Sequence, residues 1–128
     1  MERVTEPTDD SLLNDMLWAD PLPDKQANAI EFMPNAQRGT SVRFGSKPLR
    51  NLLAKSKLRT MIRAHEVKPK GYQFHMEDRN GNPSCITIFS APNYCGQYGN
   101  YGALFCSRAD APPDVLTFEE YQRKPVCF

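Results

Sequence analysis

The stretch Ile86-Thr-Ile-Phe-Ser-Ala-Pro-Asn-Tyr-Cys-Gly96 determines how the rest of the sequence is interpreted. Residues 85–89 alternate as a strand does, and residues 90–101 contain one proline and two glycines, which is typical of a loop. Upstream, residues 71–76 alternate in the same way, and residues 78–83 are rich in turn-forming side chains. The sequence therefore predicts a β-hairpin that leads directly into the loop.

The N-terminal part of the chain predicts one short helix followed by a loop. The helix has one apolar face, an N-cap at Asp9 or Asp10, and an end near Pro21, because a proline disfavours helix at the residue before it. Its apolar residues are Leu12, Leu13, Met16 and Leu17. Residues 22–37 show no steady period and contain two prolines, so they predict a surface loop with room for one turn of helix.

Between this loop and the hairpin, the pattern predicts a strand, a helix and a second strand. Residues 40–44 form the first strand, and residues 46–55 form an amphipathic helix with Ser46 as candidate N-cap. The apolar face of this helix consists of Leu49, Leu52 and Leu53. Residues 58–64 then predict a buried strand that delivers His65 to its C-terminal end, where ligands collect in layered folds.

After the loop, residues 102–106 and 115–118 predict two further strands, and residues 123–128 form a short tail. With 128 residues the chain has the length of one modest domain. Its eleven prolines and a mean hydropathy of -0.59 predict long irregular stretches. The predicted order is a helix, a strand, a second helix, and then four or five strands.

Charge and cysteine content exclude several classes of protein. Sixteen basic and fifteen acidic residues are interspersed, so nothing indicates a nucleic-acid-binding surface. No apolar run is long enough to span a membrane, and the N-terminus has no apolar signal segment. The four cysteines contain no Cys-x-x-Cys pair for zinc, and we expect a cytoplasmic or nuclear protein with reduced thiols.

Four motifs in order resemble those of the PPP family of serine/threonine phosphoprotein phosphatases. They are Leu17-Trp-Ala-Asp-Pro21, Gln37-Arg-Gly-Thr-Ser-Val-Arg-Phe-Gly45, Arg63-Ala-His-Glu-Val67 followed by Gly71-Tyr-Gln-Phe74, and the run that ends at Gly96. The resemblance covers about residues 12 to 107. Asn82-Pro-Ser84 is similar to a longer hairpin of the calcineurin branch, whereas Cys95-Gly96 is closer to the other main branches, so both assignments stay open.

The resemblance implies an α+β fold, namely the C-terminal sheet half of a metallophosphoesterase β-sandwich flanked by helices. Residues 1–128 would form a single partial domain with its core at about residues 9–121. The implied activity is metal-dependent hydrolysis of phosphoserine and phosphothreonine in proteins. Two metal ions, manganese, iron or zinc, activate a water in such enzymes. The implied partners are phosphoprotein substrates and a regulatory subunit.

The same resemblance implies roles for individual residues. Arg38 matches the arginine that binds the substrate phosphate, a role that suits the planar guanidinium. Tyr94 matches a tyrosine at the rim of the catalytic centre, and His65 matches the late metal-binding histidine. The residues that match the substrate groove or an inhibitor contact are Trp18, Asp20 and Cys95. His75, the second histidine, is interpreted as structural or exposed.

The family motifs Gly-Asp-x-His-Gly, Gly-Asp-x-x-Asp-Arg-Gly and Gly-Asn-His-Glu are absent from this sequence. Only one metal ligand, His65, is therefore expected here, and the isolated chain should show neither a stoichiometric metal pair nor turnover. We also expect marginal stability or association, with Ile86, Ile88 and Leu104 poorly buried.

Three interpretations follow from the incomplete set of motifs. The first is a fragment or truncated gene model of an active phosphatase whose missing motifs lie upstream. The second is a genuine short protein, catalytically dead, that acts as a protein-binding module. The third is an unrelated small β-rich domain, which four motifs in the right order disfavour.

Overall fold

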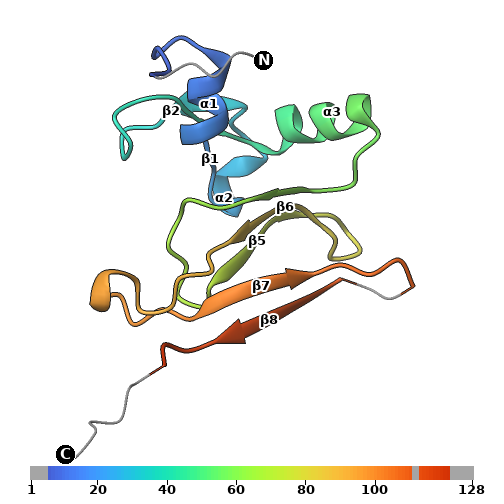
Figure 1. Ribbon diagram of the computed structural model, residues 1–128. Helices are drawn as coiled ribbons and strands as arrows, with labels where there is room; N and C mark the ends of the chain where they lie inside the picture. The colour runs from blue at the N-terminus through green and yellow to red at the C-terminus, as the bar shows by residue number, and fades with distance from the viewer. Residues whose placement is uncertain (1–5, 111–112, 122–128) are drawn as a thin grey trace, which may run out of the picture. The chain divides into compact units, whose positions relative to one another are not determined.

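The computed structural model describes residues 6–110 and 113–121 (Figure 1). These described residues form a mixed α/β structure with three small sheets. The chain divides into two compact units, and each is described by itself. Unit 1 comprises Met1–Met61 and His75–Ser84, and unit 2 comprises Ile62–Phe74 and Cys85–Phe128.

The first helix, α1, spans Leu12–Trp18 in unit 1. Its N-cap is Ser11, whose hydroxyl accepts a hydrogen bond from the Asn14 backbone N–H at 3.1 Å, so the prediction of Asp9 or Asp10 as N-cap was wrong. The helix ends before Asp20-Pro21, as predicted. The prediction of an apolar inner face fails for Leu12 and Met16, which are 75% and 70% exposed.

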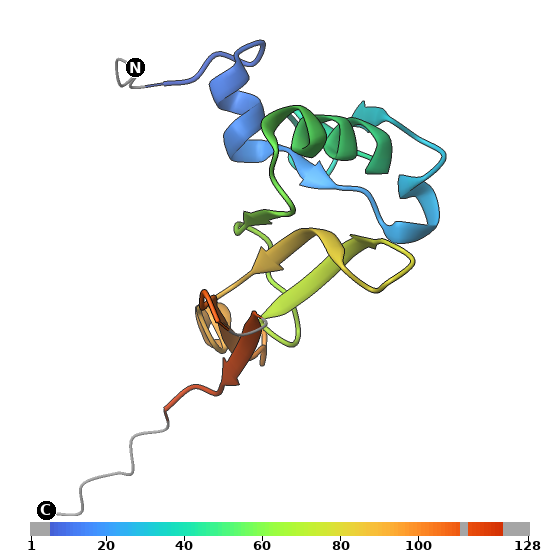
Figure 2. The ribbon, with the colours of Figure 1, turned by 90° about the vertical axis from the view of Figure 1, so that its right-hand side faces the viewer.

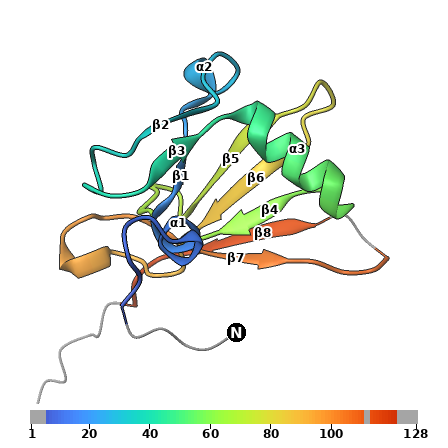
Figure 3. The same ribbon diagram turned by 90° about the horizontal axis from the view of Figure 1, so that it is seen from above.

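A three-stranded sheet in unit 1 has the order β1-β3-β2 (Figure 3). Strand β1 (Asp20–Pro21) pairs in parallel with β3 (Val42–Phe44), and β2 (Phe32–Pro34) pairs with β3 in antiparallel orientation. Helix α2 (Asp24–Ala27) is the single turn foreseen in the predicted loop. Strand β2 was missed, since it is short, exposed and contains Pro34, which a sheet tolerates at an edge.

Helix α3 (Ser46–Ser56) confirms the second predicted helix. Its N-cap is Gly45, so the prediction of Ser46 as N-cap was wrong. A Cβ at residue 45 would lie 1.8 Å from the Ile30 carbonyl oxygen, so only glycine fits there. Leu49 and Leu53 are buried. Leu52, which was assigned to the same apolar face, is 55% exposed.

The predicted hairpin is present as β5 (Tyr72–Glu77) and β6 (Pro83–Ile88), which lie side by side in a sheet of order β4-β6-β5 (Figures 1 and 2). Strand β4 (Met61–Arg63) is only half-buried, so the prediction of a buried strand was wrong. Four consecutive residues of the central strand β6 are buried, so side chains that point to both of its faces are covered. Ile86 is therefore 3% exposed, which contradicts its predicted poor burial.

Strands β7 (Gly102–Cys106) and β8 (Asp114–Phe118) confirm the two further strands that the sequence predicts. They form an antiparallel pair in unit 2. Leu104 and Leu116 face each other across this pair and are 51% and 52% exposed, so the predicted poor burial of Leu104 is confirmed. The predicted tail at residues 123–128 lies outside the described residues. Among the described helices, none is long and apolar enough to cross a membrane.

Candidate functional site

Arg38 lies in unit 1 on the turn that joins β2 to β3, and its side chain is paired with Asp20. The Arg38 Nε donates to Asp20 Oδ2 at 2.9 Å, and Nη2 donates to Oδ1 at 3.4 Å. The Arg38 side chain is 21% exposed, whereas the Asp20 side chain is only 2% exposed. A guanidinium held side-on by a buried carboxylate keeps a fixed plane and a fixed charge.

Trp18 completes this arrangement from the end of α1. The Arg38 guanidinium carbon lies 5.9 Å from the centroid of the Trp18 ring, within the range of a cation–π contact. Unit 1 therefore brings together three of the residues selected from the sequence, namely Trp18, Asp20 and Arg38. Asp20 acts here as the partner of the arginine, a role that its motif alone did not indicate.

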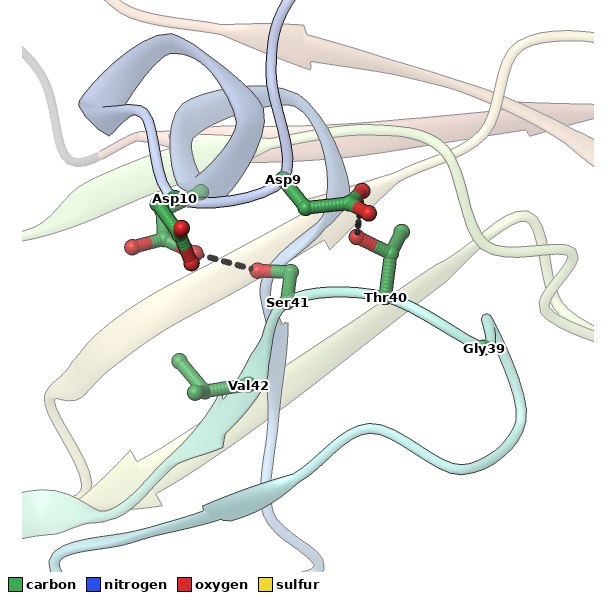
Figure 4. Close-up of a pocket in the computed structure, with 7 residues that line it drawn as sticks. Asp9, Asp10, Gly39, Thr40, Ser41 and Val42 are labelled. Carbon is green, nitrogen blue, oxygen red and sulfur yellow. Dashed lines mark hydrogen bonds between the residues drawn. The ribbon is translucent and has the colours of Figure 1, made fainter.

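A shallow pocket of about 490 Å³ lies beside the same turn (Figure 4). It is lined by Asp9, Asp10 and Asp15 on one side and by Gly39, Thr40, Ser41 and Val42 on the other. The Thr40 hydroxyl donates to Asp9 at 3.0 Å and the Ser41 hydroxyl donates to Asp15 at 2.7 Å. Three carboxylates make this pocket unsuited to a phosphate, so Arg38 is the better candidate for an anion contact.

His65 lies in unit 2, two residues beyond the end of β4, where it is exposed and has a φ of 74°. An ion pair spans this turn, since Arg63 Nη1 donates to Glu66 Oε2 at 2.5 Å. Lys68 Nζ donates to the other oxygen of Glu66 at 3.2 Å, and Arg63 also donates to the buried Thr87 hydroxyl at 3.3 Å. These half-buried charges fix the turn that presents the histidine.

Tyr94 and Cys95 lie in unit 2 on a 3₁₀ turn, η1 (Tyr94–Gly96). The Tyr94 N–H donates to the side-chain oxygen of buried Asn100 at 2.9 Å, and the Tyr94 ring meets Phe89 edge-on at 5.1 Å. The Tyr94 side chain remains 43% exposed. Its hydroxyl can therefore be presented at a rim while the backbone below it is fixed.

The cysteines differ in their accessibility. Cys95 is exposed and has a φ of 56°, whereas Cys85 is fully buried in β6. Burial raises the pKa of the Cys85 thiol to about 12, with a smaller lowering contribution from Arg63. Cys85 is thus an inert core residue, and Cys95 meets the accessibility condition for reaction with electrophiles.

Sequence reasoning missed the two asparagines that organise these loops. Asn35 is 2% exposed and contacts the Asp20 carboxylate, and Asn100 is 5% exposed and its amide donates to the backbone oxygens of Ala91 and Tyr101. Both lie in turn-rich segments, where asparagine is common, so their type alone carries little information. His75, the second histidine, is buried at 3% exposure, in agreement with a structural role.

The described residues do not fit a two-metal centre by themselves. Within residues 6–110 and 113–121, no group of three or more histidine, cysteine, aspartate or glutamate side chains is placed to hold a metal ion. His65 would be one ligand among several that a complete centre requires.

Comparison with known proteins defines the class. The chain is homologous, over most of its length, to part of a PPP-family serine/threonine phosphatase. Its relatives include serine/threonine-protein phosphatases 5. The tomato (Solanum lycopersicum) protein is 34% identical over 119 residues, which is 92% of this chain and 19% of the relative. The human protein is 39% identical over 100 residues, which is 78% of this chain and 18% of the relative.

A solved structure supports the same relationship. It is a protein serine/threonine phosphatase from Saccharomyces cerevisiae with similarity to human phosphatase PP5, and it matches 98% of this chain and 39% of its own length with a TM-score of 0.72 at 29% identity. No family model matches the chain. The chain spans about a fifth of the length of the curated relatives that it matches.

Proposed function

We propose that this chain is the C-terminal part of a metal-dependent serine/threonine phosphatase catalytic domain, in which Arg38 binds the phosphoryl group of the substrate. The observation that carries the proposal is the Arg38 guanidinium, which Asp20 and Trp18 hold in a fixed plane. The guanidinium group of an arginine carries five N–H donors in a planar fork. A guanidinium can therefore hold a carboxylate and a phosphate oxygen together.

Two other residues of the chain complete the proposed contribution. His65 would supply one metal ligand from its exposed turn, and the Tyr94 hydroxyl would contact a phosphate oxygen or a water from the rim. The remaining metal ligands would come from residues outside this sequence. The complete metal centre would then bind and activate the attacking water. The fold that this implies is one sheet half of a metallophosphoesterase β-sandwich.

The proposed substrates are phosphoserine and phosphothreonine residues of proteins, and a regulatory subunit is a proposed partner. Support comes from the names of the relatives, which are serine/threonine-protein phosphatases. The thiols of Cys85, Cys95 and Cys106 are free, which supports a reducing compartment, the cytoplasm or nucleus.

A chimera tests the proposal directly. The 119-residue matching segment of the tomato phosphatase 5 is replaced by this chain, and hydrolysis of p-nitrophenyl phosphate and of a phosphoserine peptide is measured with manganese. We expect turnover, and we expect His65→Ala to abolish it without changing the circular dichroism spectrum. A folded chimera that binds manganese and shows no turnover would overturn the proposal.

A second candidate function is that of a catalytically dead protein-binding module. Exposed apolar side chains favour it, because Leu12 and Met16 project from α1 in unit 1 and Leu104 and Leu116 project from the β7–β8 pair in unit 2. The chimera separates the two functions. A binding module requires no catalytic Arg38 or His65, so activity of the chimera that depends on both residues favours the phosphatase.

A further inference from the structure

Asn35 is a buried residue that contacts both Asp20 and the backbone of Trp18, the two residues beside Arg38. It is 2% exposed, and its side-chain amide donates to Asp20 Oδ2 at 2.8 Å and to the Trp18 backbone oxygen at 3.3 Å. Its own side-chain oxygen lies 3.5 Å from Arg43 Nε, at the limit of a hydrogen bond.

The Asn35 amide and the Arg38 guanidinium share one oxygen of the Asp20 carboxylate. Arg38 Nε donates to Oδ2 at 2.9 Å, and Asn35 Nδ2 donates to the same atom at 2.8 Å. A carboxylate that receives a second donor at a fixed position cannot rotate freely about its χ2 torsion. The Asn35 amide therefore sets the plane of the carboxylate, and the carboxylate sets the plane of the guanidinium.

The backbone of Asn35 controls the other end of the same arginine. Its carbonyl oxygen accepts from the Arg38 N–H at 3.1 Å and from the Gly39 N–H at 3.0 Å, and its own N–H donates to the Ser41 oxygen at 3.1 Å. These bonds close the turn between β2 and β3. One buried residue thus fixes both the Cα of Arg38 and the tip of its side chain.

We propose that Asn35 is a positioning residue for Arg38, acting through Asp20 to orient the guanidinium toward a phosphate. The phosphate part of this inference rests on the proposed function. The positioning part does not, because it concerns the contact between Arg38 and Asp20 and can be measured without phosphate.

The test uses the ¹⁵N-labelled chain and the side-chain Nε–Hε signal of Arg38 in NMR, which is assigned by its absence from Arg38→Lys. In the parent chain we expect a signal protected from solvent exchange by the bond to Asp20. Asn35→Ala and Asn35→Ser both lack the amide donor, and serine retains a short hydroxyl that favours turns. In both variants we expect the solvent exchange rate of Arg38 Hε to rise about tenfold. This is the factor that corresponds to the free energy of about one hydrogen bond.

Two internal references make the test specific. The control variant is Gln37→Ala on the same turn. It removes the side-chain oxygen that accepts from Arg43 Nη2 at 2.6 Å and leaves the Asp20 contacts in place. The exchange rate of Arg38 Hε in this variant should match that of the parent. The Gly39 amide reports the turn, because its bond to the Asn35 carbonyl does not involve the side chain. Equal changes at Arg38 Hε and the Gly39 amide, or no change at either, would overturn the positioning role.

Titration with inorganic phosphate then separates this inference from the proposed function. We expect phosphate to shift the Arg38 Hε signal of the parent, with weaker binding in the Asn35 variants. If phosphate shifts the signal in neither, the assignment of phosphate to Arg38 fails, whereas the positioning role is decided by the exchange data alone. Equal phosphate affinity in the parent and both variants would contradict the link between positioning and binding.

Discussion

Cys95 and Cys85 occupy opposite environments, and the difference gives a prediction for thiol reagents. We expect iodoacetamide at pH 8 to alkylate Cys95 of the folded chain rapidly, because the thiol is exposed. Cys85 should react only when the structure opens, since it is buried and its pKa is raised to about 12. Peptide mapping by mass spectrometry measures both rates. Alkylation of Cys85 as fast as Cys95 without denaturant would contradict the buried position of β6.

The raised pKa of Cys85 also predicts how stability depends on alkaline pH. Its ordinary value is 9.0, so above pH 9 the unfolded chain loses this proton first while the folded chain keeps it up to about pH 12. Stability is therefore fully present below pH 9 and falls between pH 9 and 12, by about 1.4 kcal/mol per unit from this one group. Urea unfolding of Cys85→Ala should show a shallower fall over this range. If the unfolding free energies of the parent and of Cys85→Ala fell equally with pH, the raised pKa of Cys85 would be refuted.

The sequence could predict site residues that belong to a recognisable motif. It could not predict residues whose role depends on contacts made only in the folded chain. Arg38, His65 and Tyr94 were selected because each stands inside a recognisable run of residues. Asn35 could not be selected, since its role depends on a fold that brings it against Asp20, fifteen positions away in the sequence. The pairing of Asp20 with Arg38 likewise arises from the parallel register of β1 with β3.

Helix α3 shows what the periodicity of an element can and cannot predict. Leu49, Leu52 and Leu53 share one face of a helix, yet only the first and last are buried. The pattern defines a direction, whereas the width of the buried stripe depends on what packs against it. Strand β2 was missed for a related reason, because three exposed residues that include Pro34 carry no alternating signal.

The two adjacent leucines of α3 form a matched pair for a stability measurement. Leu53→Ala removes a side chain that is 6% exposed and should cost about 2–5 kcal/mol of unfolding free energy. Leu52→Ala removes one that is 55% exposed and should change stability by less than about 0.5 kcal/mol. Chemical denaturation of the two variants measures the difference. Equal losses of unfolding free energy in the two variants would contradict the burial of Leu53 and the exposure of Leu52 on α3.

At the scale of the whole molecule, the two main helices and the strands after α3 were predicted, and within the described residues five strands follow α3. Strands β1 and β2, which lie between α1 and β3, were not predicted. The β-sandwich and the single partial domain stay predictions, as do the boundaries of its core. Sequence patterns specify which segments form helices and strands, whereas the partners of an exposed sheet depend on surfaces that no local pattern describes.

The exposed apolar side chains predict how the isolated chain behaves in solution. Leu104 and Leu116 form an exposed cross-strand pair, so we expect association or a broad unfolding transition at low temperature. Sedimentation of the parent and of the double variant Leu104→Ser and Leu116→Ser measures this, with a larger monomer fraction in the variant. A monomeric parent with one cooperative thermal transition would contradict this expectation.

The phosphate contact of Arg38 is tested most directly by a conservative substitution in the phosphatase 5 chimera. Arg38→Lys keeps a positive charge beside buried Asp20 but loses the planar fork, so folding should be retained. We predict that kcat/KM for a phosphoserine peptide falls about 10- to 100-fold. Arg59→Lys, at an exposed position, should leave it unchanged. Equal kcat/KM for Arg38→Lys and the parent chimera would contradict the assignment of Arg38 as the phosphate-binding residue.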